Sequence, residues 1–178
     1  DQMAVLYRTN SLSRLLEDFL SLARPRRLAH APVDLSVLCE HVVSMHRPVA
    51  ESAGLKLSLQ LADCLPKVLG DQPRLTQVLI NLVVNAIDAM RAIGHGEIVL
   101  TAESAGPERV RVTVADQGPG IAPEVVDKIF TPFVSTKERG TGLGLSIVKR
   151  IIDLHNGTVA LRPRPGGGAI AEVVLRAA

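Results

Sequence analysis

The residues with the clearest chemical potential lie between positions 72 and 92, where apolar side chains recur with a helical period. At 100° per residue most of that predicted helix is apolar, and its polar side chains share a wedge of roughly 80°. They are Arg74, Gln77, Asn81, Asn85 and Asp88. Amides one turn apart, at Asn81 and Asn85, can offer oxygens to a hard cation such as Mg²⁺ without adding charge. Taken alone, the helix is equally compatible with an exposed polar strip.

A second candidate is the sequence Asp116-Gln-Gly-Pro-Gly120, which follows a predicted strand at 109–115 with Val110, Val112 and Val114 alternating. A carboxylate at Asp116 could accept a hydrogen bond from an exocyclic amino group. Gly118 and Gly120 would allow a flat ring to approach the backbone. A simple turn built from Asp, Gly and Pro is the competing interpretation, and it is favoured when the motif is considered alone.

A third candidate is Gly140-Thr-Gly-Leu-Gly-Leu145, which leads into a helix predicted over 145–155. Glycines just before a helix leave backbone N–H groups free for phosphate oxygens. The segment has no strand directly before it and no Gly-Lys-Ser/Thr ending, so it is neither a dinucleotide fingerprint nor a P-loop. Phe130-Thr-Pro-Phe133 and Lys137 precede it. The two rings could anchor a loop from which Lys137 reaches a phosphate.

The elements that must position these residues divide the chain into three parts. An apolar stripe predicts a helix over residues 1–24, ended by Pro25, and a linker over 25–32. The domain at 33–178 has predicted helices at 36–53, 72–92 and 145–155, with Asp71 as an N-cap. Its predicted strands lie at 55–61, 97–103, 109–115, 158–162 and 169–175. Because they follow no regular βαβ repeat, we expect an α+β fold, a two-layer sandwich with helices on one face of the sheet.

Composition narrows the function classes. The 178 residues carry a net charge of +2 and are 47% hydrophobic, which suits a folded domain rather than a disordered chain. The scarcity of aromatic residues argues against a single-strand nucleic-acid binder, so no nucleic-acid partner is expected. Cys39 and Cys64 have no metal-binding spacing, and we expect both to be reduced core residues of a cytoplasmic protein. No membrane span or signal peptide is visible, so a membrane would be reached only through upstream segments.

The order of the motifs is more specific than any one of them. The sequences Asn81-Leu-Val-Val-Asn-Ala, Asp-Gln-Gly-Pro-Gly, Phe-Thr-Pro-Phe and Gly-Thr-Gly-Leu-Gly-Leu resemble the N, first glycine, F and second glycine boxes of bacterial two-component sensor histidine kinases. The resemblance covers about residues 33–176. The short segment at 134–140 is similar to the nitrogen-regulation branch. The resemblance implies the Bergerat ATP-binding sandwich, shared with gyrase, mismatch-repair ATPases and a heat-shock chaperone.

The resemblance also implies roles for individual residues, with ATP and Mg²⁺ as cofactors. Asn85 would coordinate Mg²⁺, Asn81 would support metal and phosphates, and Lys137 would act with them in catalysis. Asp116 would bind the adenine amino group. Asp88 stands where some relatives carry a basic residue, which leaves more phosphate charge to Lys137. The remaining expected nucleotide contacts are Gly118, Gly120, Ile121, Phe133, Thr136, Gly140, Thr141, Gly142, Leu143 and Gly144.

The helix at 1–24 resembles the second helix of the family's dimerisation and phosphoacceptor hairpin. None of the five histidines is followed by an acidic residue, as the family's phosphoacceptor would be, so that histidine is expected upstream of residue 1. The resemblance therefore implies a protein-histidine kinase domain that phosphorylates a hairpin of its own protein. The full-length protein would be a homodimer that passes the phosphoryl group to a cognate response regulator.

Two other functions stay open. An ATP-hydrolysing enzyme of the gyrase or chaperone type would keep a glutamate, the general base for water, one turn before the metal-binding asparagine. Asn81 stands there, and an amide has no useful basicity. A nucleotide-binding scaffold that does not transfer phosphate is the non-catalytic alternative. An anti-sigma-factor serine kinase is disfavoured by the hairpin-like helix at 1–24.

Overall fold

The computed structural model describes residues 28–134 and 142–178. The helix expected at 1–24 lies outside the described residues, as do residues 25–27 of the expected linker at 25–32. Thr136, Lys137, Gly140 and Thr141 also lie outside them, so their expected roles stay predictions.

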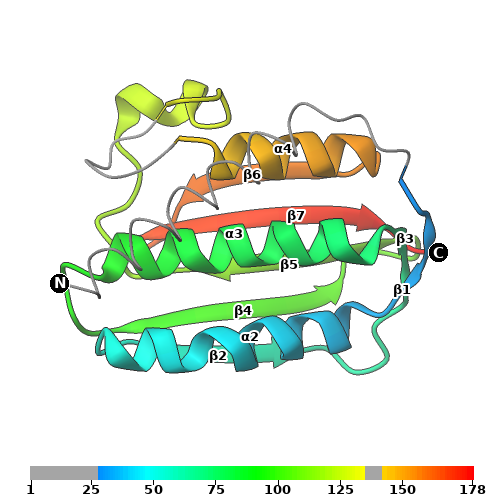
Figure 1. Ribbon diagram of the computed structural model, residues 1–178, viewed down its shortest axis with the longest axis horizontal. Coiled ribbons are helices and arrows are strands. Elements are labelled where there is room, and N and C mark those ends of the chain that lie inside the picture. Colours follow the sequence, from blue (N-terminus) through cyan, green and yellow to red (C-terminus); the bar gives the residue numbers. More distant parts are fainter. Residues whose placement is uncertain (1–27, 135–141) are drawn as a thin grey trace, which may run out of the picture.

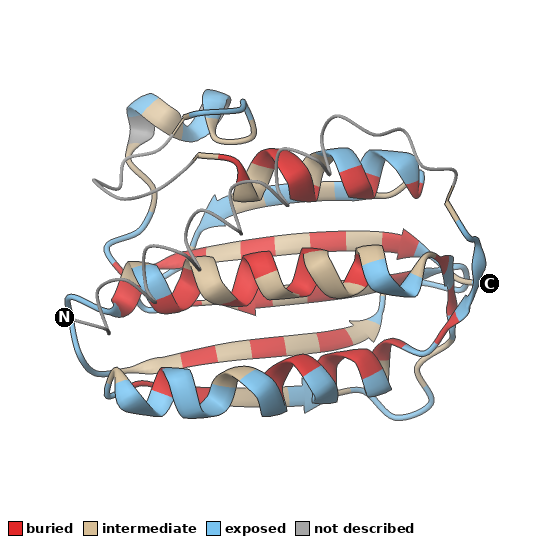
Figure 2. Cartoon of the chain, viewed as in Figure 1, coloured by how far each residue is buried: buried red, intermediate tan, exposed pale blue. Residues whose placement is uncertain are grey.

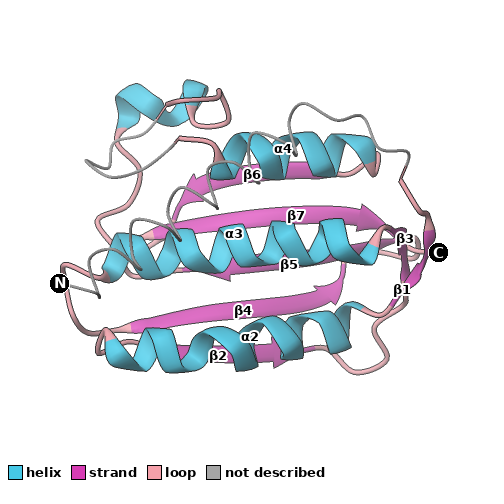
Figure 3. Cartoon of the chain, in the orientation of Figure 1, coloured by secondary structure: helices cyan, strands magenta, loops and turns pink. Residues whose placement is uncertain are grey.

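The domain is a two-layer sandwich, with three long helices packed on one face of a five-stranded sheet (Figures 1 and 3). The strands are β2 (Lys56–Leu61), β4 (Glu97–Ser104), β5 (Arg109–Ala115), β6 (Thr158–Pro163) and β7 (Ala169–Arg176). Their order across the sheet is β2-β4-β5-β7-β6. The β2–β4 pair is parallel and the other pairs are antiparallel. The predicted α+β sandwich and all five predicted strands are confirmed.

The three helices are α2 (Leu35–Ser52), α3 (Gln72–Met90) and α4 (Gly144–Leu154). α3 begins where predicted because the side chain of Asp71 accepts a hydrogen bond from the backbone N–H of Arg74. Pro73 occupies the first turn, where a missing N–H does no harm. Asp34 caps α2 in the same way, through the N–H groups of Ser36 and Val37. Figure 2 shows buried residues on all three helices and on β4, β5 and β7.

The sequence did not reveal three short elements. β1 (Ala31–Val33) pairs antiparallel with β3 (Val68–Gly70) in a separate two-stranded sheet, and Pro123–Lys128 form a 3₁₀ helix. Strands of three residues are too short to display an alternating pattern. The pairing matters because β1 belongs to the segment that enters the domain, and β3 leads directly into Asp71 and α3.

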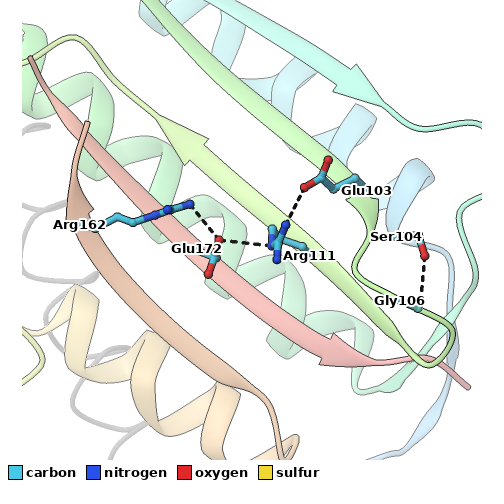
Figure 4. A network of polar contacts seen from close by, with 6 residues as sticks. All are labelled: Glu103, Ser104, Gly106, Arg111, Arg162 and Glu172. Atoms are coloured by element: carbon cyan, nitrogen blue, oxygen red, sulfur yellow. Dashed lines mark hydrogen bonds and ion pairs between the residues drawn. The ribbon is translucent and has the colours of Figure 1, made fainter. Parts of the chain in front are cut away.

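The face of the sheet away from the helices carries a chain of ion pairs. Arg111 lies between Glu103, 3.0 Å from its Nη1, and Glu172, 3.3 Å from its Nε, while Arg162 Nη2 lies 3.1 Å from the same Glu172 carboxylate (Figure 4). The four side chains come from four adjacent strands. Glu103 is paired with Arg111, and Glu172 lies two residues from the partners of Arg111 and Arg162 on β7. Because residues two apart on a strand point to the same face, all four side chains lie on one face. These pairs are partly exposed, so each contributes at most about 1 kcal/mol.

One expectation about the cysteines is wrong. Cys39 is a buried core residue on α2, and burial, with a smaller effect of Glu40, raises the pKa of its thiol to about 12. Cys64 is exposed, in the loop after β2, and its backbone has a positive φ of 57°. Of its apolar neighbours in the sequence, Leu61 is the last residue of β2 and Leu65 is only partly buried. Neither thiol forms a disulfide.

Candidate functional site

The start of α4 lies against the two asparagines of α3. A Cβ added to Gly144 would lie 3.6 Å from Oδ1 of Asn81 and 3.7 Å from Nδ2 of Asn85. Figure 1 shows α3 and α4 side by side on the same face of the sheet. The fold therefore brings the polar wedge of one predicted motif to the backbone of another, although more than fifty residues separate them in the sequence.

The two asparagines differ in their surroundings. Asn81 is only 8% exposed, and its Nδ2 atom is buried without a hydrogen-bond partner among the described residues. Asn85 is half-buried and makes interactions of its own. Leaving a buried amide unpaired costs about 1–3 kcal/mol, so such a group in a native fold calls for a partner. Asn81 therefore fits a site that a polar ligand completes.

The second glycine segment, at Gly142 to Gly144, also contacts the loop that contains Phe130-Thr-Pro-Phe133. The N–H of Phe133 donates to the carbonyl of Gly142 over 3.0 Å. Gly142 has a φ of +67°, and a Cβ there would lie 2.6 Å from the backbone of Phe133. A side chain at this position would separate the two segments, so the contact requires glycine. Leu143, between the two glycines, is buried in the core.

Asp116 is held in place by the ends of two strands. Its side chain is 7% exposed, and Oδ1 accepts hydrogen bonds from the N–H of Gly118 over 2.8 Å and of Ala169 over 3.1 Å. Such bonds fix the orientation of a buried carboxylate. Gly118 lies against α3, since a Cβ there would lie 3.4 Å from Cβ of Ala89. The first glycine segment therefore packs beside the helix that carries both asparagines.

Sequence reasoning missed two residues that support Asp116. A Cβ at Gly168, whose φ is +96°, would lie 2.0 Å from the backbone oxygen of Asp116. Nη1 of Arg164 donates to the same oxygen over 3.2 Å. Nothing in the sequence relates the run Gly166-Gly-Gly168 to a residue about fifty positions earlier.

The remaining described candidates lie at the margin of this arrangement. Asp88 is exposed on α3 and lies 3.9 Å from the guanidinium of Arg91. Ile121 is half-buried just after Gly120, which has a φ of +83°. The side chain of Phe133 is 72% exposed, so only its backbone takes part in the contacts described above.

Taken together, the geometry suits a nucleotide with bound Mg²⁺. Asn81 supplies a buried amide in need of a partner, and Gly144 leaves backbone without a side chain beside it. Asp116 supplies a fixed hydrogen-bond acceptor flanked by glycine. Amide oxygens are suitable ligands for Mg²⁺, which retains waters and phosphate oxygens as its other ligands. The described residues therefore fit the expected Mg²⁺-bound nucleotide.

Known proteins are similar to this chain in sequence and in fold. The family described as histidine kinase-, DNA gyrase B-, and HSP90-like ATPase matches residues 70–178. The sensor histidine kinase ZraS of Escherichia coli (strain K12) is 40% identical over 158 residues, which cover 89% of this chain and 33% of ZraS. This chain spans about a third of the length of curated sensor histidine kinases that it matches. None of the described helices is long and apolar enough to cross a membrane.

Two solved kinases are similar in structure. Full-length ShkA in complex with AMPPNP has a TM-score of 0.85 and 34% identity, covering 98% of this chain and 38% of ShkA. The catalytic domain of histidine kinase ThkA has a TM-score of 0.75 and 33% identity, covering 85% of this chain and 97% of that domain. ThkA in complex with response regulator protein TrrA matches with a TM-score of 0.78 and 32% identity, over 96% of this chain and 49% of ThkA. On this evidence the chain belongs to the histidine kinase-, DNA gyrase B- and HSP90-like ATPases, and among them to the catalytic domains of sensor histidine kinases.

Proposed function

We propose that this chain binds Mg-ATP and transfers the γ-phosphoryl group to a histidine upstream of residue 1 in a longer, dimeric protein. That histidine would lie on the first helix of the dimerisation hairpin, whose second helix is the one predicted at 1–24. The observation that supports this function best is Asn81, which lies beside Gly144 and whose buried amide nitrogen has no hydrogen-bond partner among the described residues. The AMPPNP complex of the similar kinase ShkA supports an ATP analogue as the ligand.

The proposed site assigns each group one task. The adenine amino group would donate to the carboxylate of Asp116, with the ring against Gly118 and Gly120. Phosphate oxygens would accept from backbone N–H groups at Gly142, Leu143 and Gly144, where the start of α4 also favours negative charge. Further phosphate contacts would come from Thr136, Lys137, Gly140 and Thr141. The amide oxygen of Asn85 would hold Mg²⁺, which supplies charge neutralisation on the phosphates.

Transfer is favoured over hydrolysis by the residue at position 81. Attack by water benefits from a general base, and the buried amide of Asn81 cannot take up a proton. A neutral imidazole needs no deprotonation before it attacks. Its nitrogen forms a bond to the γ-phosphorus while the bond to the bridging oxygen breaks, and ADP leaves. What this asks of the chain is positioning, which α3 and the glycine segments provide.

The next partner in the proposed sequence of reactions is a response regulator. The similar kinase ThkA forms a complex with response regulator TrrA, which supports a partner of the same class here. The phosphohistidine would pass its phosphoryl group to that partner, as expected for signal transduction through a two-component system. The catalytic portion would work in the cytoplasm, where ATP is available.

Mixing the chain with γ-labelled ATP tests this function directly. The reaction would be run with the chain alone, with a separately produced phosphoacceptor hairpin, and with a hairpin whose histidine is replaced by glutamine. We expect acid-labile label on the unmodified hairpin only, because no histidine of this chain precedes an acidic residue. Acid-stable label on the chain alone would indicate a different kinase class. Rapid release of phosphate without a hairpin would favour the ATPase alternative, and binding without transfer would favour a scaffold.

A further inference from the structure

The segment preceding β1 contacts the N-terminus of α3 and the C-terminus of α4. The N–H of Ala29 donates to Oδ2 of Asp71 over 3.1 Å, just before α3 begins. The ring of His30 lies edge-on to the ring of His155, which follows the last residue of α4, with centroids 5.7 Å apart. We call Ala29, His30, Asp71 and His155 the entry junction.

Asp71 does more than cap a helix. Its Oδ1 accepts from the N–H of Arg74 over 3.1 Å, which is all that the cap of α3 requires. Its second carboxylate oxygen holds the entering chain at Ala29. Asp34 provides a comparison within the same domain, because among the described residues its side chain accepts only from the first turn of α2, through one oxygen.

His155 links the same aspartate to α4. The ring is 4% exposed, and its Nε2 accepts from the backbone N–H of Asp71 over 2.9 Å. Its proton must therefore be on Nδ1, which donates to the carbonyl of Ile151 over 2.7 Å. Gly70 leaves room for this ring, since a Cβ there would lie 3.0 Å from its Cδ2. His46 makes an equivalent bond to the carbonyl of Val42 on α2, but its ring bonds to no second element within residues 28–134 and 142–178.

The entry junction thus ties the incoming chain to both helices that carry the candidate nucleotide site. Asn81 and Asn85 lie on α3, and Gly144 begins α4. Downstream of the junction, β1 pairs with β3 along its whole length, from Ala31 with Gly70 to Val33 with Val68. The entering chain is therefore fixed from Ala29 onward, and its direction of entry is set at the junction.

We propose that Asp71 and His155 are positioning residues that fix how the upstream hairpin is presented to the nucleotide site. This inference rests on the proposed function. A fixed entry limits the orientations that the catalytic domain samples relative to a hairpin on the same chain, which raises the fraction in a reactive pose. Asp71 and His155 do not orient the hairpin when the hairpin is a separate molecule.

The test compares a hairpin in the same chain with a hairpin added in trans. Asp71→Ser keeps one oxygen for the cap but has no second oxygen for Ala29, and Asp34→Ser is its matched control. Ala29→Pro removes the donor from the other side of the same bond. For each variant the readouts are Mg-ATP affinity, initial transfer rate in both formats, and hydrogen exchange of the amides at 28–33.

We expect Asp71→Ser and Ala29→Pro to slow transfer to the covalently joined hairpin at least threefold. Mg-ATP affinity and transfer to the separate hairpin should stay within twofold of the unmodified protein. Amide exchange at 28–33 should accelerate at least tenfold, and Asp34→Ser should change none of these quantities. His155→Leu should speed exchange of the Ala29 and Asp71 amides, whereas His46→Leu should not.

Unchanged or faster transfer to the covalently joined hairpin in the two variants would overturn the proposal. An equal loss in both formats would also overturn it, because that result indicates damage to the site itself. If the unmodified protein transfers to neither hairpin, the proposed function fails instead. The amide exchange then decides whether the junction holds the entering chain, and unchanged exchange in Asp71→Ser would refute the junction as well.

Discussion

Asp116 has two tasks in this account, and two substitutions should separate them. Its Oδ1 accepts from the backbone N–H groups of Gly118 and Ala169, both in a buried setting. Asp116→Ala leaves two buried donors unpaired at about 1–3 kcal/mol each, so unfolding free energy should fall by about 2–6 kcal/mol. Asp116→Asn keeps one carbonyl oxygen for these donors, and its loss should be closer to about 1 kcal/mol.

Nucleotide affinity tests the second task of Asp116, through the Asp116→Asn substitution. Asn would present an amino group to the adenine amino group in place of an acceptor, which removes a charge-assisted hydrogen bond of about 1.5–3 kcal/mol. The affinity of Asp116→Asn for Mg-ATP should therefore fall roughly ten- to a hundredfold. The unmodified chain should prefer ATP to GTP, whose base presents a carbonyl at that edge, and the variant should lose this preference.

Urea denaturation and calorimetry measure the two effects independently. Asp153→Asn is a suitable control, because this aspartate is exposed on α4 and pairs with Lys149. A folded Asp116→Asn protein that binds Mg-ATP as tightly as the unmodified chain, or equal competition by GTP, would refute the adenine role. A stability loss in Asp116→Ala no larger than in Asp116→Asn would refute the structural role.

Three further predictions concern other parts of the domain. Asn85→Ala should abolish measurable Mg-ATP binding in calorimetry. The protein should stay folded, because loss of a half-buried amide leaves no large cavity. Unchanged binding would contradict the metal assignment. Gly168→Ala should lower the unfolding free energy by about 2–5 kcal/mol, since it combines a positive φ with a backbone oxygen 2.0 Å away. Gly166→Ala, with a similar φ and no atom within 4 Å, should lose only about 1–2 kcal/mol, and equal losses in urea denaturation would contradict the contact. At pH 8 iodoacetamide should label exposed Cys64 but not Cys39, whose thiol has a pKa of about 12 and stays protonated; labelling of Cys39 before unfolding, seen by mass spectrometry, would be inconsistent with that burial.

The sequence predicted those features that depend on local patterns. Alternating valines identified β5 to the residue, and Asp71 with Pro73 located the start of α3. Asn81 and Gly144 were identified as separate motifs, and their proximity in the structure supports treating them as one site.

Features that depend on contacts between distant segments were not predictable in this way. The bond from Ala169 to Asp116 spans 53 positions and leaves no periodic signal. β1 and β3 form by pairing with each other, and neither three-residue strand is long enough to show an alternating hydrophobic pattern. His155 looked like the unremarkable end of a helix, because its partner at Asp71 lies 84 positions away. Burial of Cys64 was inferred from neighbouring apolar residues, but Cys64 is exposed in the loop between β2 and β3.

In the proposed function, one nucleotide site is formed by the two asparagines, Asp116 and the start of α4. A crystal structure of this chain with Mg²⁺ and AMPPNP tests it most directly. We predict the amide oxygen of Asn85 on the metal, the adenine amino group within hydrogen-bond distance of Asp116, and phosphate oxygens along the backbone at 142–144. A nucleotide bound elsewhere on the domain, or a base that does not contact Asp116, would contradict the account.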